Sequence, residues 1–326
     1  MADVAHHAGT SMISVSRAFR HSPLVSEALK TRIFSAATEL GYVPNRAASA
    51  LASARSMNIA VLIPSMTNTV FVDTLAGINT ELGPRGYQML IGTTDYSPEE
   101  EFRLLRTFLE FSPDGLLIAG ADHLPSTSGI IEKLAAPTVH LMEIDADRSR
   151  YSVGLSQTEG GYAIGRHLVA RGYTRIGFVA AQLDPRTLAR GEGYRQALQE
   201  AGLYEPRREL RVPDRSSISL GAELLDRMLD EFPDTDALFF CNDDLAQGAL
   251  FHCQRRGISV PQDLALAGFN DLPVSAWTVP SLTTIATPRY EIGVQAARML
   301  LGLLSGEQPA QPHCDLGFEL KTREST

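Results

Sequence analysis

The sequence predicts an α/β protein in which a small all-helical module precedes a larger part built on parallel sheets. One observation is the distribution of charge. Residues 1–55 carry six basic and three acidic side chains, a net charge of +3, whereas the remainder carries 23 basic and 35 acidic ones, a net charge of −12. The other is a change of pattern, because apolar residues recur at helical spacing before residue 42 and gather into short runs after residue 58. We therefore expect a cationic module joined to an anionic body, although the whole chain has a net charge of −9.

The first forty residues predict three short helices. DVAHHAG (3–9) reads as a helix ended by its glycine, and MISVSRAF (12–19) as a second helix that Thr10 or Ser11 can cap. A third helix is expected over about 26–40. Helix, glycine-containing turn and helix form the helix-turn-helix pattern, and the serines and arginine of the second helix suit phosphates and a guanine edge. Composition alone leaves a small helical bundle with a solvated serine face as an equal alternative.

Residues 42–55 (YVPNRAASALASAR) predict a linker helix. Pro44 keeps the residue before it out of helical geometry, and Asn45 is a good N-cap for the alanine-rich stretch that follows. Such a helix cannot bury a face of its own and is marginal in isolation. We expect it to order only when something holds it, and its Leu51 could then enter a DNA minor groove as a wedge.

Taken together, the motifs DVAxxAG, SVSRAF and ELGYVPN…L resemble the LacI/GalR family of bacterial sugar-responsive repressors, and the likeness extends along nearly the whole chain. The resemblance implies a helix-turn-helix DNA-binding domain over 1–44, a hinge helix and linker over 45–57, and a two-lobed effector-binding and dimerisation domain over 58–326. It implies DNA contacts by Ser11, Met12, Ile13, Ser16, Arg17, Asn45, Arg46 and Leu51.

The chain departs from the family pattern in two places. Family members usually have a few residues, including a capping threonine, before the DVA motif, whereas only Met1 and Ala2 precede it here. Either the true start lies upstream or the first helix begins frayed. In the hinge, Ser49 stands where many members have arginine, which removes one expected phosphate contact.

From residue 58 the pattern is that of parallel βαβ units. Strands are expected at NIAVLIP (58–64), YQMLIGT (87–93), GLLIAG (115–120), VHLM (139–142), RIGFVAA (175–181), ALFFC (237–241) and LALAGF (264–269). They suffice for two open sheets, over roughly 60–155 and 160–280, with a cleft at the carboxyl ends of their strands. The resemblance implies the same periplasmic-binding-protein-like fold, with the chain crossing between the lobes several times.

The candidate effector-binding residues follow these strands. They are Ser65, Asn68, Phe71 and Glu143 in the first lobe, and Arg186, Arg190, Asn242 and Asn270 in the second, with both arginines near the rim of the cleft. Two guanidiniums among amides and carboxylates suit a small polyol that bears an acid group. By resemblance, Arg190 and Asn242 match family sugar-binding positions and Glu143 an acidic one. Asn270 stands where sugar-binding members usually have aspartate, which favours a sugar acid over a neutral sugar.

Several of these features also have plain structural interpretations. Phe71 could be a core residue, and Asp244 could serve only to stabilise the start of a helix. Trp277 is expected to pack under a loop rather than to bind a ligand. GGYAIG (160–165) is glycine-rich but falls in an expected helix, so it is a weak phosphate-binding signal. The histidines show no metal spacing, and we expect neither a metal nor a cofactor.

Other classes of protein fit less of the chain. An enzyme would need a nucleophile–base pair or a metal cluster, and no such spacing stands out. An uptake binding protein would need a secretion signal, and we find neither that nor an apolar stretch that could span a membrane. Cys241, Cys253 and Cys314 form no CxxC motif and suit small buried residues in a reducing cytoplasm.

A cytoplasmic DNA-binding sensor is the interpretation that uses the whole chain. Within the family, SVSRAFR, PSMTNTVF, CNDDLAxGAxFxCQRxG and DLGF are most similar to gluconate-operon repressors. We therefore expect a homodimeric repressor of a pseudo-palindromic operator, with gluconate as its effector. A response to 2-ketogluconate or to a neutral sugar is the alternative, and so is a corepressor-dependent direction of control. The C-terminal residues carry no heptad repeat that would form a tetramerising coil.

Overall fold

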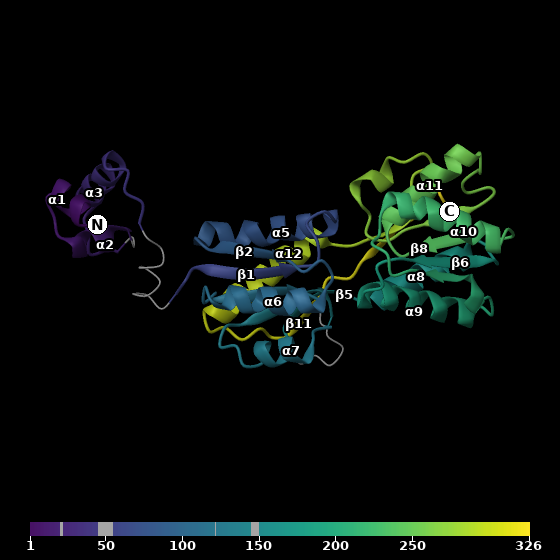
Figure 1. The fold of residues 1–326 in the computed structure, drawn as a ribbon, viewed down its shortest axis with the longest axis horizontal. Helices are drawn as coiled ribbons and strands as arrows, with labels where there is room; N and C mark the ends of the chain where they lie inside the picture. The colour runs from purple at the N-terminus through teal and green to yellow at the C-terminus, as the bar shows by residue number, and fades with distance from the viewer. Residues whose placement is uncertain (20–21, 45–54, 121, 145–149) are drawn as a thin grey trace. The chain divides into compact units, whose positions relative to one another are not determined.

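The structure, a computed structural model, describes residues 1–19, 22–44, 55–120, 122–144 and 150–326. The chain divides into two compact units, Met1–Met57 and Asn58–Thr326, whose elements Figure 1 labels. The predicted linker helix, with Asn45, Arg46, Ser49 and Leu51, lies outside the described residues. The α/β fold class predicted from the sequence is confirmed.

The first unit contains the three predicted helices. They are α1 (Ala2–His7), α2 (Met12–Phe19) and α3 (Glu27–Glu39). Helix α1 starts without a side-chain cap, whereas Ser11 caps α2, since its Oγ accepts from the backbone N–H of Ser14 at 3.2 Å. Between them Gly9 adopts a φ of 57°, which a side chain would make costly.

The core of this unit consists mostly of small residues. It is formed by Val4, Ala5, Ala8, Val15, Ala18, Val25, Ile33, Ala36 and Ala37. Alanines allow the helix axes to approach closely, and Phe19, Leu29 and Tyr42 close the edges of the cluster. This packing fixes α2 by its Val15 and Ala18 face and leaves its other face to solvent.

The second unit begins with a lobe built on a fully parallel six-stranded sheet. Its order is β11 (His313–Asp315), β5 (Ser152–Leu155), β4 (Thr138–Glu143), β3 (Gly115–Ala119), β1 (Asn58–Ile63) and β2 (Gln88–Thr93). One face is covered by α5 (Thr69–Leu82) and α12 (Arg289–Leu304), and the other by α6 (Pro98–Leu109) and α7 (Pro125–Ile131) (Figure 1). The central strands are buried on both faces, which explains their uninterrupted apolar sequences.

The second lobe repeats the same construction on a smaller sheet. Its parallel strands lie in the order β7 (Glu209–Arg211), β6 (Ile176–Ala180), β8 (Ala237–Phe240) and β9 (Ala265–Ala267). Its helices are α8 (Gln157–Ala170), α9 (Pro185–Glu200), α10 (Ile218–Glu231) and α11 (Asp243–Arg256). Figure 1 shows α8 and α9 on one face of this sheet, with α10 and α11 on the other.

Short elements complete the unit. A two-stranded antiparallel ribbon pairs β10 (Thr284–Ala286) with β12 (Glu319–Lys321), and short 3-10 turns occupy Gly83–Arg85, Pro206–Arg208 and Pro273–Ala276. The lobes are interleaved in sequence, because α12 and β11 belong to the first lobe although they follow the strands of the second. The strand regions predicted over 60–155 and 160–280 are therefore correct as local ranges but incomplete as lobes.

Two features of the second lobe were singled out in the sequence, the glycine-rich run over 160–165 and Trp277. The glycine-rich run of α8 serves helix packing: a Cβ on Gly161 would lie 2.0 Å from the carbonyl oxygen of Arg190 in α9. The expectation that Trp277 packs under a loop is wrong, because 85% of its surface is exposed beside the turn at Pro273–Ala276. Among the described residues, every helix is too short or too polar to cross a membrane.

Candidate functional site

The exposed face of α2 carries most of the side chains predicted to contact DNA in this helix. Ser11, Met12, Ile13 and Arg17 are exposed and Ser16 is half-buried. Met12 and Ile13 expose 56% and 64% of their surface, so their apolar groups can be reached from outside the unit. The arrangement offers apolar groups for thymine methyls next to hydroxyl and guanidinium donors for phosphates and base edges.

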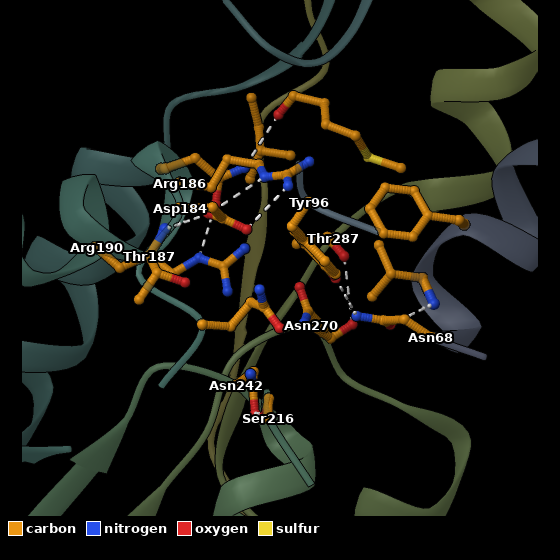
Figure 2. A pocket seen from close by; sticks show the side chains of 16 residues that line it. Asn68, Tyr96, Asp184, Arg186, Thr187, Arg190, Ser216, Asn242, Asn270 and Thr287 are labelled. Carbon is orange, nitrogen blue, oxygen red and sulfur yellow. Dashed lines mark hydrogen bonds and ion pairs between the residues drawn. The ribbon is translucent and has the colours of Figure 1, made fainter. Parts of the chain in front are cut away.

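The second unit has a cavity between its two lobes that is partly open to solvent (Figure 2). It is lined by Asn68, Val70, Phe71, Tyr96, Met142, Leu155, Gln157, Gln182, Asp184, Arg186, Thr187, Arg190, Ser216, Asn242, Asn270 and Thr287. Most of these follow the carboxyl ends of parallel strands, where ligands bind in open α/β sheets. Figure 2 shows Asp184, Arg186 and Arg190 entering from one side and Asn68 from the opposite side.

Six of the eight predicted effector-binding residues line this cavity, and Ser65 and Glu143 do not. The Ser65 hydroxyl is used within its own loop, where it accepts from the backbone N–H of Asn68 at 3.3 Å and lies 3.0 Å from the hydroxyl of Thr67. Glu143 ends β4 and lies behind Arg186, with 3.8 Å between its Oε1 and the guanidinium Nε. Direct contact of either residue with a ligand is therefore not supported by this geometry.

The two arginines are buried, not at the rim as expected. Arg186 and Arg190 expose 9% and 8% of their surface. Both lie on the first two turns of α9, which begins at Pro185 after the N-cap Asp184. Because the helix starts directly behind β6, its first side chains point into the cavity rather than into solvent.

The carboxylate of Asp184 neutralises Arg186. Its Oδ2 accepts from Nη2 of Arg186 at 2.9 Å, and its Oδ1 caps α9 by accepting from the N–H of Thr187 at 3.0 Å. Burial alone would raise the pKa of Asp184, but Arg186 and these hydrogen bonds outweigh it and hold that pKa below its usual value. Burial likewise opposes the charge of Arg186, yet Asp184 and Glu143 raise its pKa.

Arg190 has a different environment, because its hydrogen-bond partners are neutral and the charges of Asp184 and Arg186 act on it only through space. Its Nε donates to the side-chain oxygen of Gln157 at 2.8 Å and its Nη1 to the carbonyl of Cys241 at 2.7 Å. The guanidinium carbon lies 3.9 Å from the centre of the Phe269 ring. Burial lowers the pKa of Arg190 to about 10, so the side chain stays charged at neutral pH.

Phe71, Asn68 and Tyr96 form the wall contributed by the first lobe. Phe71 is 3% exposed and lines the cavity, with its ring centre 5.6 Å from the guanidinium carbon of Arg186. Asn68 caps α5 through its side-chain oxygen, and its amide nitrogen donates to the Tyr96 hydroxyl at 3.4 Å. Burial raises the pKa of Tyr96, so its hydroxyl stays protonated and remains a donor.

Asn242 and the loop after Asn270 are held in place by hydrogen bonds on the side away from the cavity. The side-chain oxygen of Asn242 accepts from the hydroxyl of Ser216 at 3.0 Å and caps α11, which leaves its amide group for the cavity. The loop after Asn270 is braced by the fully buried Asp243, which accepts from the hydroxyls of Ser275 and Thr284 at 2.7 and 2.6 Å. Asp243 is thus a structural residue, and Asp244 beside it lies in the first turn of α11.

Sequence reasoning missed several lining residues, chiefly Tyr96, Gln157, Asp184, Ser216 and Thr287. Tyr96 and Asp184 follow β2 and β6, so the rule that selected the other candidates could have found them. Gln157 and Thr287 lie on segments that connect the lobes, and nothing in a local pattern marks such a segment. Across the described ranges, no group of three or more acidic, histidine or cysteine side chains is arranged to hold a metal ion.

Comparison with known proteins supports both parts of the chain. Residues 1–45 match the family described as bacterial regulatory proteins of the lacI family, and residues 166–326 match a periplasmic binding protein-like domain. The HTH-type transcriptional regulator GntR of Pseudomonas aeruginosa is 48% identical over 99% of this chain and 94% of its own.

Two solved structures show the same fold. The transcription regulator GntR from Chromobacterium violaceum is 52% identical, with a TM-score of 0.80 over 82% of this chain and 98% of its own. The lac repressor dimer bound to operator and an anti-inducer is 25% identical, with a TM-score of 0.87 over 99% of this chain and 98% of its own. These relatives are regulators and not enzymes. The Pseudomonas regulator and the lac repressor each align with 99% of this chain and therefore with both units.

Proposed function

Because this chain belongs to the lacI family of bacterial regulatory proteins and is a DNA-binding transcriptional regulator, we propose that it represses sugar-acid metabolism until a sugar acid binds. The observation that carries the effector class is Arg190, a buried cation that lines the cavity and is bonded only to neutral atoms. A carboxylate is the ligand group that complements such a guanidinium. The likeness to gluconate-operon repressors makes gluconate the first choice.

The DNA partner follows from the first unit. We assign operator contacts to Ser11, which caps α2, and to Met12, Ile13, Ser16 and Arg17 of α2, because the exposed face of such a helix fits a major groove. Since the lac repressor binds its operator as a dimer, we propose a two-fold dimer and an operator of two paired half-sites. With operator DNA as the partner, a cytoplasmic location is part of the proposal.

The proposed switch is a shift between two arrangements of the lobes. A ligand in a cavity lined by both lobes favours the arrangement that brings both walls to it, and it can shift the equilibrium only by its difference in affinity. Such coupling is reciprocal, so operator DNA should weaken effector binding by the same factor. The proposal therefore requires that effector lowers operator affinity by the same factor by which operator lowers effector affinity.

The function is tested by selecting an operator from random duplexes with the full chain and titrating the complex with gluconate, 2-ketogluconate, glucose and glucitol. We expect gluconate to release the operator, and gluconate affinity to fall by the matching factor when operator is present. Release by a neutral sugar, tighter operator binding with gluconate, or no effect of any sugar acid would each contradict the proposal.

Arg190→Gln tests the residue that carries the argument. Losing a hydrogen bond to a charged group of this kind should weaken gluconate binding about 10- to 100-fold and leave operator affinity unchanged. The matched control is Arg207→Gln, which removes an arginine of the same lobe that is 76% exposed and lies 3.7 Å from Glu205 of that lobe. We expect the control to bind gluconate as the unaltered chain does, and an equal loss in both variants would reject the assignment.

A further inference from the structure

We infer that the cavity binds its acidic effector in one direction, with the carboxylate on Arg190 and the hydroxyl-bearing tail toward Asp184 and Asp122. The site would then select sugar acids with a single acidic group and reject those with a second one at the far end. The inference rests on the proposed function and goes beyond it, because a sugar-acid sensor need not distinguish the two ends of its ligand.

The first step is that the two arginines of the cavity are not equivalent. Arg186 lies 2.9 Å from the carboxylate of Asp184 and 3.8 Å from that of Glu143, so its charge is already compensated. Arg190 touches an amide oxygen, a backbone carbonyl and an aromatic ring, none of which carries a charge. An incoming carboxylate therefore gains most at Arg190.

The second step is that the cavity continues into an acidic annex. An adjoining cavity shares Tyr96, Asp184 and Arg186 with the main one. Its remaining walls are Pro64, Thr94, Ser97, Pro98, Glu101, Ala119 and Asp122. The annex thus holds three carboxylates against one guanidinium. Asp184 pairs with that guanidinium, and Glu101 lies 2.8 Å from the imidazole of His123. The main cavity and the annex differ in charge along one path.

The third step is that a second anion at this end would meet further carboxylates. Partial burial raises the pKa of Asp122 although Arg186 lies nearby, whereas the pKa of Asp184 stays below its usual value because Asp184 pairs with Arg186. A second carboxylate or a phosphate placed there would face Asp122 and Glu101, while the guanidinium of Arg186 already pairs with Asp184. Hydroxyl groups suit it, because a hydroxyl donates to a carboxylate without adding charge.

The test is calorimetric titration of the full chain with D-gluconate, D-glucarate, 6-phospho-D-gluconate and D-glucitol. Glucarate and 6-phosphogluconate carry a second acidic group at the far end, and glucitol has none at either end. We expect gluconate to bind at least about tenfold more tightly than each of the other three. The second acidic group of glucarate and of 6-phosphogluconate would lie beside carboxylates, and like charges placed together are strongly disfavoured. Glucitol lacks the carboxylate that would pair with Arg190. Glucarate or 6-phosphogluconate binding as tightly as gluconate would overturn the inference.

Two variants assign the two ends separately. Asp122→Asn should reduce the difference in affinity between gluconate and glucarate and leave the difference between gluconate and glucitol unchanged. Arg190→Gln should reduce the difference in affinity between gluconate and glucitol and leave the difference between gluconate and glucarate unchanged. Glu110→Gln, which removes an exposed carboxylate at the end of α6 in the first lobe, is the control and should change neither difference in affinity. If neither variant changes its own difference, or if Glu110→Gln changes either one, the direction is wrong.

The outcomes separate this inference from the proposed function. If gluconate and glucarate bind equally well, the proposed sensor function is supported and the proposed binding direction of the effector is wrong. If no sugar acid binds, both the proposed function and the binding direction are wrong.

Discussion

Asn270 has a backbone conformation that few residues other than glycine adopt, with a φ of 114°. Its N–H donates to the carbonyl of Ile285 at 2.8 Å, and its own carbonyl accepts from the Thr287 hydroxyl at 3.3 Å and from the Arg289 guanidinium. Such a conformation costs about 1–3 kcal/mol and persists only where neighbours enforce it. The result is an amide fixed in the cavity wall, where an aspartate would place a further charge.

Asn270→Asp tests the meaning of that amide. The two side chains have nearly the same shape, so the variant changes charge with little change of packing. We expect gluconate affinity to fall about tenfold or more through like-charge repulsion, and the affinity for a neutral polyol such as glucitol to be unchanged. Titration calorimetry with both ligands checks this, and an equal loss for glucitol would point to shape instead of charge.

At the scale of elements, the site depends on the close contact of α8 with α9. Besides Gly161, a Cβ on Gly193 would lie 1.9 Å from the carbonyl of Thr158, and one on Gly165 would lie 2.7 Å from the Cβ of Ala197. The glycines therefore let the two backbones touch. Since α9 carries Arg186 and Arg190, this contact positions both guanidiniums as well as stabilising the lobe.

Gly161→Ala should separate these helices. We expect the free energy of unfolding to fall by about 1–3 kcal/mol, as overpacking does in a tightly packed core, and gluconate affinity to fall because Arg190 shifts. Gly129→Ala on α7 is the control, since its added Cβ meets nothing within 4 Å. The control should be neutral or up to about 1 kcal/mol more stable. Equal urea midpoints for the two variants would contradict this account.

Most of the fold was predictable because its signals are local. The buried parallel strands are nearly continuous apolar runs, and α2 falls on the predicted 12–19. The strands β5, β7, β10, β11 and β12 were missed, since runs of only three or four residues are too short for a period to be recognised. Trp277 was misplaced because an apolar side chain is expected to be buried, and no local pattern marks an exposed one.

The cavity was predictable in position but not in electrostatics. Strand ends gave Asn68, Phe71, Arg186, Arg190, Asn242 and Asn270, all of which line it. What spacing could not give is the partner of each charge. Part of the difference between Arg186 and Arg190 is local, because Asp184 pairs with Arg186 two residues further on. The rest arises from contacts with Glu143, Gln157 and Cys241, which lie 33 to 51 residues away from the arginine they contact. Such contacts are set by the fold as a whole.

On the scale of the whole second unit, Arg289 is one of the side chains that link the two lobes beside the cavity. Arg289 starts α12 in the first lobe and pairs there with Asp73 of α5 at 2.9 Å. Its guanidinium also donates to the carbonyls of Asn270 and Asp271, which belong to the second lobe. Helices α5 and α12 pack closely, because a Cβ added to Gly77 would lie only 2.1 Å from the carbonyl oxygen of Tyr290. This packing fixes the backbone from which Arg289 extends.

Arg289→Met should weaken this tie. We expect gluconate affinity to fall about tenfold, since hydrogen bonds to charged groups contribute about 1.5–3 kcal/mol, and Arg289→Lys to lose less because it keeps the charge. The control is Arg298→Met on the same helix, whose guanidinium is half exposed and pairs with Glu81 inside the first lobe. Calorimetry on the three variants decides, and an equal loss in the control would remove Arg289 from this role.

The interleaving of the lobes also bears on how the protein is made. The first lobe lacks its helix α12 and edge strand β11 until residue 315 has been synthesised, and Thr326 bonds to Thr283 and His167 in the second lobe, at 2.8 Å in each case. The helices of the first unit, in contrast, are complete within the first forty residues. On the ribosome the DNA-facing unit can therefore fold well before its sensor, since domains form from the N-terminus onward during translation. A growing chain acquires the part that binds before the part that controls binding, and the response to effector arrives only with its last residues.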